Sequence, residues 1–121
     1  MTNQSESLIY KVLRPEEWAG FQAQRVFTGS AVDVSDGFIH FSTWFQLAET
    51  LHKHFAEHTE LILLEIDAAE FGDEIKWEES RGGQLFPHLY SELAISSVAR
   101  STTINKQDGR FQLPTWAQDR D

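Results

Sequence analysis

The sequence predicts an α+β domain whose helices lie in the first half of the chain and whose second half is mostly strands. The order of patterns is strand, helix, strand, helix and then strands, which is typical of segregated α+β folds. The length of 121 residues fits one domain with one core. A hydrophobic content of 40% that includes 12% aromatic residues is enough to fill that core.

The N-terminal part of the chain begins with a polar segment, 1–7, which we expect to be a disordered tail. Residues 8–13 are apolar enough for a first strand. Pro15 then begins a predicted helix at 15–24, because proline is favoured at a first helical position and acidic residues follow it. Residues 25–36 are rich in Gly, Ser and Asp and are predicted to form a loop.

A tight-turn dipeptide leads into a short predicted strand at 38–42. Because side chains alternate along a strand, His40 and Ser42 are expected to share one face. A capping-box pattern opens the next predicted helix, 43–58, whose apolar residues recur at helical spacing.

The second half of the chain carries the remaining strands. Residues 61–66 form a near-continuous apolar run, which predicts a central strand. Alternating or β-branched patterns predict further strands at 75–78 and within 93–104. The sequence therefore predicts one domain spanning 8–113, followed by a C-terminal tail at 114–121.

The charge of the chain limits its partners. A formal net charge of −9 argues against binding to nucleic acid or to an anionic membrane. A small anionic ligand stays possible where Arg81 lies near His40 or His88. The chain has no cysteine and shows no apolar signal or membrane-spanning segment, so we expect a cytoplasmic protein.

Residues 78–90 contain the densest group of chemically useful side chains. Adjacent glycines disfavour a strand and Pro87 disfavours a helix, so we interpret the segment as a shaped loop that forms a site. The backbone of Arg81, Gly82 and Gly83 suits an anion, and a simple tight turn is the alternative.

Five side chains, three of them in this segment, are candidates for chemistry or binding. His40 and Ser42 suit a hydrogen-bonding pair on the floor of a cleft, although a half-buried histidine bonded to backbone is the structural alternative. Glu78 suits a general base or a group that stabilises positive charge, with a solvated strand end as its alternative. His88 and Tyr90 are two residues apart and are expected to face one side, unless the segment is purely structural.

Two histidines are spaced like a pair of metal ligands on a helix. His54 and His58 lie four residues apart, but no third ligand is evident nearby in the sequence. We therefore expect a solvated face there and predict no metal site.

Several motifs together resemble a bacterial family of unknown function, DUF952. The motifs are Asp-Gly-Phe-Ile-His-Phe-Ser-Thr at 36–43, Leu-Leu-Glu-Ile-Asp at 63–67, Lys-Trp-Glu at 76–78, Ser-Arg-Gly-Gly at 80–83 and Leu-Phe-Pro-His-Leu-Tyr at 85–90. The resemblance covers residues 8–104. It implies a small cytoplasmic protein with a fold similar to that of the ADP-ribosyltransferases, in which a split β-sheet with two early helices forms a cleft for NAD.

The resemblance also implies roles for individual residues. By analogy with ADP-ribosyltransferases, His40 would hold a ribose and Glu78 would stabilise an oxocarbenium-like transition state, making these two the catalytic candidates. The implied ligand-binding residues are Ser42, Thr43, Trp77, Arg81, Gly82, Gly83, His88 and Tyr90. Trp77 or Tyr90 would stack on the ligand, and Arg81 would meet a phosphate.

The expected function is therefore binding of a nucleotide-like ligand, NAD or a related compound, with action on a glycosidic bond. No cofactor is certain, and NAD is the possible one. The alternative is a non-catalytic module for protein interaction or structure with a degenerate cleft, whose protein partner the sequence does not identify. The acidic composition and the scarcity of arginine near the motifs argue against an RNA substrate.

Overall fold

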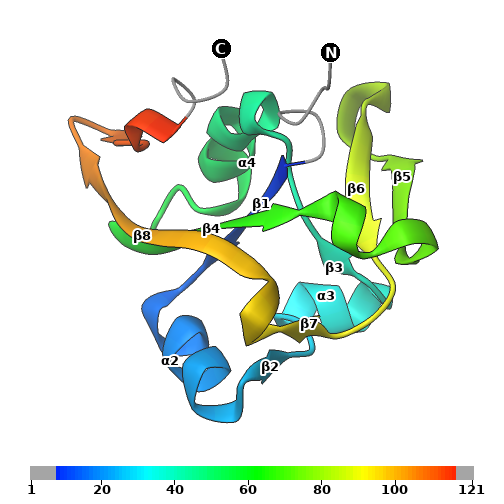
Figure 1. The fold of residues 1–121 in the computed structure, drawn as a ribbon. Coiled ribbons are helices and arrows are strands. Elements are labelled where there is room, and N and C mark those ends of the chain that lie inside the picture. The colour runs from blue at the N-terminus through cyan, green and yellow to red at the C-terminus, as the bar shows by residue number, and fades with distance from the viewer. Residues whose placement is uncertain (1–7, 117–121) are drawn as a thin grey trace.

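The computed structural model describes residues 8–116 and shows a mixed α+β fold with a curled antiparallel sheet, as the sequence predicts (Figure 1). The largest sheet has the order β1-β4-β8-β9. Its strands are β1 (Leu8–Leu13), β4 (Glu60–Asp67), β8 (Val98–Gln107) and β9 (Arg110–Phe111). A second sheet contains β3 (Ile39–His40), β6 (Leu85–Leu89) and β5 (Ile75–Glu79), and a small third sheet pairs β2 (Val26–Phe27) with β7 (Leu93–Ala94).

The helices of the described region are short and precede most of the strands. They are α2 (Pro15–Gln24), α3 (Ala31–Asp36) and α4 (Leu47–His54). One more α-helix is present than the sequence predicts. Single 3-10 turns connect the elements: η1 (Trp44–Gln46), η2 (Ala68–Glu70), η3 (Gly72–Glu74), η4 (Arg81–Gly83) and η5 (Ile95–Ser97).

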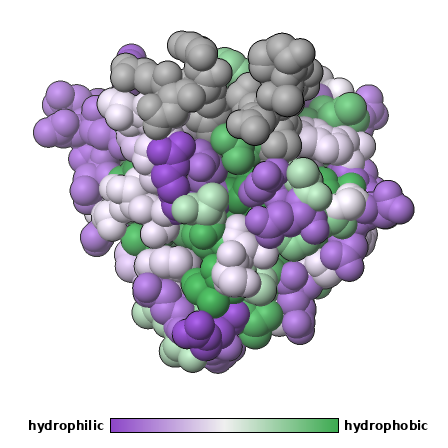
Figure 2. Space-filling view, viewed as in Figure 1, coloured by the Kyte–Doolittle hydropathy of each residue, from purple (hydrophilic) through white to green (hydrophobic). Residues whose placement is uncertain are grey.

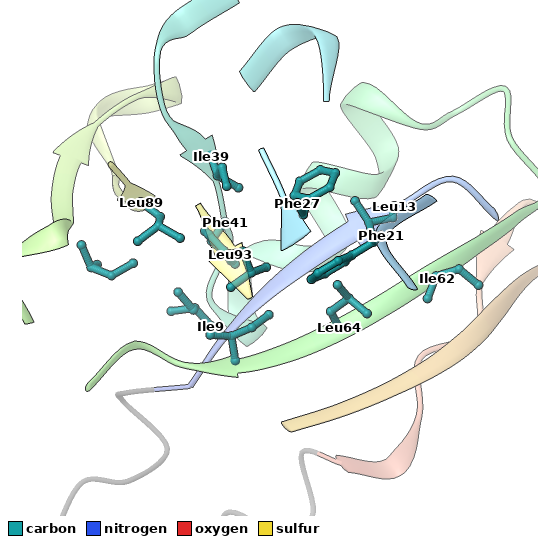
Figure 3. Close-up of a cluster of buried hydrophobic side chains, with 12 residues drawn as sticks. Ile9, Leu13, Phe21, Phe27, Ile39, Phe41, Ile62, Leu64, Leu89 and Leu93 are labelled. Carbon is teal, nitrogen blue, oxygen red and sulfur yellow. The ribbon is translucent and has the colours of Figure 1, made fainter. Parts of the chain in front are cut away.

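Strand β4 is central, as its apolar run predicts. It pairs antiparallel with β1 on one side and with β8 on the other. Its side chains from Leu61 to Ile66 are all buried, and successive residues enter different cores. Ile62 and Leu64 belong to the core that Figure 3 shows, while Leu61 and Leu63 belong to a second core with α4.

The two predicted helices form where their start signals are. Helix α2 has the predicted bounds, and the Arg14 backbone N–H donates to Glu17 Oε1 at 2.8 Å ahead of its first turn. The capping box at Thr43 is also confirmed, because its Oγ1 accepts from the Gln46 N–H at 3.2 Å. The helix after it is shorter than predicted: η1 comes first and α4 ends at His54.

The prediction of a loop at 25–36 is wrong, because β2 and α3 lie there. The polar residues that resemble a loop are caps of a short helix. The Ser30 backbone N–H donates to Asp33 Oδ2 at 2.9 Å, and Gly37 ends α3 with a φ of 89°.

The prediction of a loop at 78–90 is also wrong, because this segment is most of a β-hairpin. Its two glycines lie in the turn η4, with φ values of 63° and 78°. Pro87 lies inside β6, and its C=O accepts from the Phe41 N–H at 3.0 Å. The nitrogen and the C=O of one strand residue point to the same side, so the nitrogen of Pro87 also faces β3. The missing N–H therefore removes a hydrogen bond between β6 and β3 and leaves the pairing of β6 with β5 intact.

The two larger sheets join through a single backbone bridge between Tyr10 and Ser42. Each residue donates its N–H to the C=O of the other, at 2.8 and 2.9 Å. Beyond this pair the two strands diverge. The backbone groups of His40 bind side chains there instead of a neighbouring strand: its C=O accepts a hydrogen bond from Lys11 Nζ at 2.9 Å, and its N–H donates to Asp33 Oδ1 at 3.2 Å. The divergence opens a space between β1 and β3.

The described residues extend past the predicted C-terminal limit of the domain. The predicted tail at 1–7 lies outside the described residues, as do residues 117–121. Trp116 packs against the second core, three residues beyond the predicted end of the domain at Leu113. No helix in the described part of the chain is long and apolar enough to cross a membrane.

Candidate functional site

A cavity of about 650 Å³ lies where β1 and β3 diverge. Strands β1, β3 and β6 and helices α3 and α4 contribute to its wall. Its polar lining includes Lys11, Asp33, His40, Ser42 and His88. A volume of this size is within the range of pockets that hold small molecules.

Asp33 is the most heavily bonded side chain of this region, and it is fully buried. Its Oδ2 lies 2.9 Å from Lys11 Nζ, and its Oδ1 accepts from the ring Nδ1 of His40 at 2.7 Å. Burial alone would raise the pKa of Asp33, but the hydrogen bond from His40 and the Lys11 ammonium hold that pKa well below its usual range. Burial lowers the pKa of Lys11, and Asp33 opposes this effect.

His40 links α3 to β3 through both of its ring nitrogens. Nδ1 binds Asp33, and Nε2 lies 3.0 Å from Asp36 Oδ2. A carboxylate can only accept hydrogen bonds, so the ring nitrogen that binds Asp33 carries a proton. The imidazole therefore holds the two α3 carboxylates against the strand.

His88 is buried and is held by a more exposed pair of residues. Its Nδ1 lies 2.7 Å from Glu78 Oε1, which also accepts from the Tyr90 hydroxyl at 2.8 Å. The hydrogen bonds from His88 and then Tyr90 lower the pKa of Glu78, and the bond to Glu78 raises the pKa of Tyr90. These three side chains form a chain of hydrogen bonds from the cavity wall to the surface.

His88 is among the residues that line the cavity, and its second ring nitrogen is not held by a described residue. Among the described residues, Nε2 has no hydrogen-bond partner, and the buried side-chain atom that lacks a partner is Nδ1 of His58 instead. Nε2 of His88 is therefore not enclosed by protein. In the neutral imidazole, a proton on Nδ1 that is donated to Glu78 leaves the lone pair on Nε2, which can then accept a proton or a hydrogen bond.

Phe38 packs the two histidines together. Its ring stacks on His88 with 4.1 Å between centroids and lies 4.6 Å from His40. The two imidazoles are 5.3 Å apart. This packing fixes the orientation of both rings.

Comparison with known proteins identifies the family. Residues 12–101 match the family model described as "Protein of unknown function (DUF952)". The chain belongs to the DUF952 family. It is similar to protein CC0527 from Caulobacter crescentus, whose X-ray structure is 47% identical with a TM-score of 0.82, and the match covers 87% of this chain and 93% of that chain. The solution NMR structure of CC0527 is 42% identical with a TM-score of 0.79, over 93% and 96% of the two chains.

Comparison with curated proteins found no match to this DUF952 chain. The family that the sequence motifs indicate is confirmed by the match to the family model. The chemistry of the protein is inferred below from the residues of the cavity. The similarity to the ADP-ribosyltransferase fold stays a prediction.

The cavity of this DUF952 protein brings together only some of the predicted site residues. His40, Ser42 and His88 line it, and Ser42 Oγ lies 2.9 Å from Thr50 Oγ1. Glu78 and Tyr90 are not in its wall but connect to it through His88. The roles of these residues stay predictions.

Other predicted ligand-binding residues lie away from the cavity wall. Thr43 caps η1, and Trp77 is 41% exposed on β5. Gly82 and Gly83 lie in the hairpin turn, together with the backbone of Arg81. In the described structure Thr43, Trp77, Gly82 and Gly83 are not among the residues that line the cavity, and the side chain of Arg81 lies outside the description.

The histidines of α4 do not form a helical pair. The helix ends at His54, so His58 lies beyond it. No cluster of three or more His, Cys, Asp or Glu side chains in the described part of the chain is arranged to hold a metal.

Two residues of the site escaped the sequence analysis. Lys11 interrupts an otherwise apolar strand pattern, and Asp33 lies within the segment that resembles a loop. A lysine in a buried strand needs a counter-charge. That requirement is the signal that would have drawn attention to Lys11 and to a nearby carboxylate.

Proposed function

We propose that this DUF952 protein is cytoplasmic, binds a small nucleotide-like ligand such as NAD or a related compound in the cavity, and cleaves a glycosidic bond. The observation that carries the proposal is His88. Its side chain lines the cavity, its Nδ1 is held by a carboxylate, and its Nε2 has no hydrogen-bond partner among the described residues. A histidine oriented in this way is suited to general acid-base chemistry.

The lining of the cavity supports a ligand with a flat ring and a sugar. Tyr10, Phe41, Phe55 and Phe86 contribute apolar aromatic surface, on which a heterocyclic base can pack. The hydroxyl of Ser42 suits a hydroxyl of a ribose, and Nε2 of His88 is left for the attacking water. A ribose attached to a heterocyclic base combines these two needs.

The proposed reaction is hydrolysis of the bond between C1′ of the ribose and the nitrogen of the base. His88 Nε2 takes a proton from water while the water oxygen bonds to C1′. The C1′–N bond breaks, and the base leaves with the electron pair. The carboxylate of Asp36, which lies in the cavity wall and is 44% exposed, stabilises the positive charge that develops on the ribose.

The two predicted catalytic residues take positioning roles in this scheme. The carboxylate of Glu78 holds the tautomer and orientation of His88. His40 holds Asp33 and Asp36 toward the cavity through its two ring nitrogens. The cleft between diverging sheets also supports a relation to the ADP-ribosyltransferase fold, as the motifs imply.

The test measures ligand binding and turnover separately. We would screen NAD, ADP-ribose, nicotinamide and ribosides by thermal shift, where a ligand at 100 times its Kd stabilises by about 2.7 kcal/mol. Product formation would then be followed by chromatography. We expect His88→Gln to lose turnover by ~100-fold or more, while His52→Gln on the exposed face of α4 keeps wild-type turnover. Absence of both binding and product across the panel would overturn the proposal.

A second candidate is a non-catalytic module for protein interaction or structure. The internal pairing of the polar side chains favours it, because Lys11 and Asp33 bind one another and Glu78 binds His88 and Tyr90. This reading predicts that His88→Gln lowers the Tm strongly. Turnover that is lost at an unchanged Tm would contradict it.

A further inference from the structure

We infer that the cavity selects ribosides without phosphate, either neutral or with a cationic base, over nucleotides that carry phosphate. The inference rests on the proposed function, since it names the ligand class of the same cavity. Its basis is that Lys11 and Arg14, the lysine and the arginine of the described cavity wall, are each paired with a carboxylate. A phosphate needs a positive charge that is still available.

The first cation of the wall is already offset. Lys11 Nζ lies 2.9 Å from Asp33 Oδ2 and donates to the C=O of His40 at 2.9 Å. Asp33 is fully buried and its pKa is held low, so it keeps its negative charge at neutral pH. The ammonium has one further N–H, and with its charge offset it suits a ribose hydroxyl better than a phosphate.

The second cation is offset by two carboxylates. Arg14 lies 3.1 Å from Glu16 Oε2 and 3.4 Å from Glu17 Oε2. Glu17 is itself part of the cavity wall, and its other oxygen accepts from the Arg14 backbone N–H. A phosphate that approached Arg14 would meet Glu17 at the same position.

The wall also carries a carboxylate beyond those two ion pairs. Asp36 lies at the cavity with its side chain 44% exposed, in contact with Nε2 of His40. The whole chain has a formal net charge of −9, which extends a negative potential into the opening. A phosphate group is therefore repelled, whereas a neutral sugar is not and a cationic base is attracted.

The polar groups that remain available are suited to hydroxyls. Ser42 Oγ lies 2.9 Å from Thr50 Oγ1, and because a hydroxyl oxygen has two lone pairs, Ser42 keeps acceptor capacity beside this bond. Nε2 of His88 adds an acceptor for a proton of the attacking water. Neither group supplies the charge that a phosphate requires.

The experiment compares matched ligands that differ only in phosphate. Binding of nicotinamide riboside and of its 5′-phosphate would be measured by isothermal titration calorimetry, and likewise inosine and its 5′-monophosphate. We expect each riboside to bind at least ~10-fold more tightly than its phosphate. The difference should shrink at high salt, because screening weakens charge repulsion and leaves shape selection unchanged.

Two carboxylate variants locate the effect. Asp36→Asn should narrow the difference between riboside and phosphate, because it removes a charge from the cavity wall. Asp73→Asn changes the net charge of the chain equally, but Asp73 lies on η3 and is not among the residues that line the cavity. We expect Asp73→Asn to leave the difference unchanged.

The possible outcomes separate this inference from the proposed function. Phosphates that bind as tightly as ribosides, or more tightly, would overturn the inference while the proposed function stands. If Arg81→Gln then weakens only the phosphates, the predicted phosphate contact of Arg81 accounts for the result. A panel in which neither class binds would overturn both.

Discussion

Asp33→Asn is the substitution that most directly tests the reading of the buried network. The two carboxylate oxygens of Asp33 accept four hydrogen bonds, two on each oxygen. Oδ1 accepts from the backbone N–H and from the ring Nδ1 of His40, at 3.2 and 2.7 Å. Oδ2 serves Lys11 Nζ and the Ser30 N–H, both at 2.9 Å.

An asparagine can satisfy only one of these two sides. If its oxygen faces His40, its NH₂ group meets the donors of Lys11 and Ser30, and the opposite orientation fails at His40. Lys11 is also left in the interior without a counter-charge. Removing one partner of a buried ion pair costs about 3–5 kcal/mol. Since 1 kcal/mol moves the Tm of a domain of this size by about 3–6 °C, we expect the Tm to fall by at least about 9 °C.

Urea denaturation followed by circular dichroism would measure the loss, with an unchanged m-value as evidence for two-state unfolding. The matched control is Asp36→Asn, the other carboxylate on His40, whose side chain is 44% exposed. An exposed pair contributes about 0–1 kcal/mol, so this variant should be close to wild type. The double variant Lys11→Met with Asp33→Asn should be more stable than the sum of the two single changes by about 0.5–3 kcal/mol.

An Asp33→Asn variant within about 1 kcal/mol of wild type would refute this reasoning. Strict additivity of the two single changes would refute it as well, because the argument depends on a direct interaction between the two side chains.

Three further predictions follow from other parts of the structure. The pKa of Asp33 is lowered in the folded protein, so its stabilisation is present above its unfolded pKa of about 3.9 and is lost as the pH falls through the folded value. The free energy of unfolding of the wild type should therefore fall steeply between about pH 5 and pH 2. A smaller dependence on pH in Asp33→Asn would support this assignment, whereas an equal dependence would contradict it. In Glu78→Gln, the raised pKa of Tyr90 should return toward its ordinary value, as an ultraviolet titration of the two tyrosines would show; an unchanged curve would mean that the 2.8 Å bond contributes nothing. Leu64→Ala should cost about 2–5 kcal/mol because Leu64 is fully buried, whereas Phe45→Ala should stay within about 0.5 kcal/mol because Phe45 is 94% exposed; equal Cm values in urea would contradict the core assignment.

Local patterns in the sequence were sufficient for the parts of the fold that local physics decides. The apolar run at 61–66 identifies β4 as central because only a strand buried on both faces tolerates such a run. Pro15 and Thr43 mark the starts of helical segments through their own backbone chemistry. The same chemistry at Ser30 went unrecognised, because a short helix with few apolar residues has no strong periodicity.

The hairpin at β5 and β6 shows what local patterns could not decide. Pro87 is disfavoured in a strand in general, but here its nitrogen faces a short neighbour that ends beside it. Whether a proline is tolerated in a strand depends on which neighbour its nitrogen faces. The neighbouring strand β3 is distant from β6 in the sequence, so local patterns do not reveal this arrangement. Tertiary placement therefore overrides the expectation of a loop.

The sequence was sufficient to predict that two histidines belong to the site, but not which charged side chains pair with one another there. His40 and His88 carry recognisable motifs, and the structure brings their rings to 5.3 Å. The pairing of Lys11 with Asp33 joins residues 22 positions apart in the chain, through a helix that the sequence did not reveal. Which charges are offset is a property of the folded arrangement, and this is what changes the expected ligand from a nucleotide to a riboside.

The single bridge between Tyr10 and Ser42 has a mechanical consequence. Apart from that residue pair and the hydrogen bond from Lys11 Nζ to the His40 C=O, the sheet of β3, β6 and β5 meets the larger sheet through apolar side chains. Ile39 and Leu89 belong to the same core as Ile9 (Figure 3). Packing of this kind is not directional, unlike a strand ladder. The joint can therefore act as a shear plane, along which a small tilt changes the width of the cavity without breaking a row of hydrogen bonds.

Much of the outer surface would not resist such a tilt. Figure 2 shows hydrophilic residues around the rim of the visible face, with hydrophobic residues interspersed toward its centre. Hydrated side chains at the rim exchange one set of water contacts for another when two layers shift. The buried contacts between the two sheets would therefore provide most of the resistance to a tilt, and His40 on β3 and His88 on β6 lie on the same side of the joint.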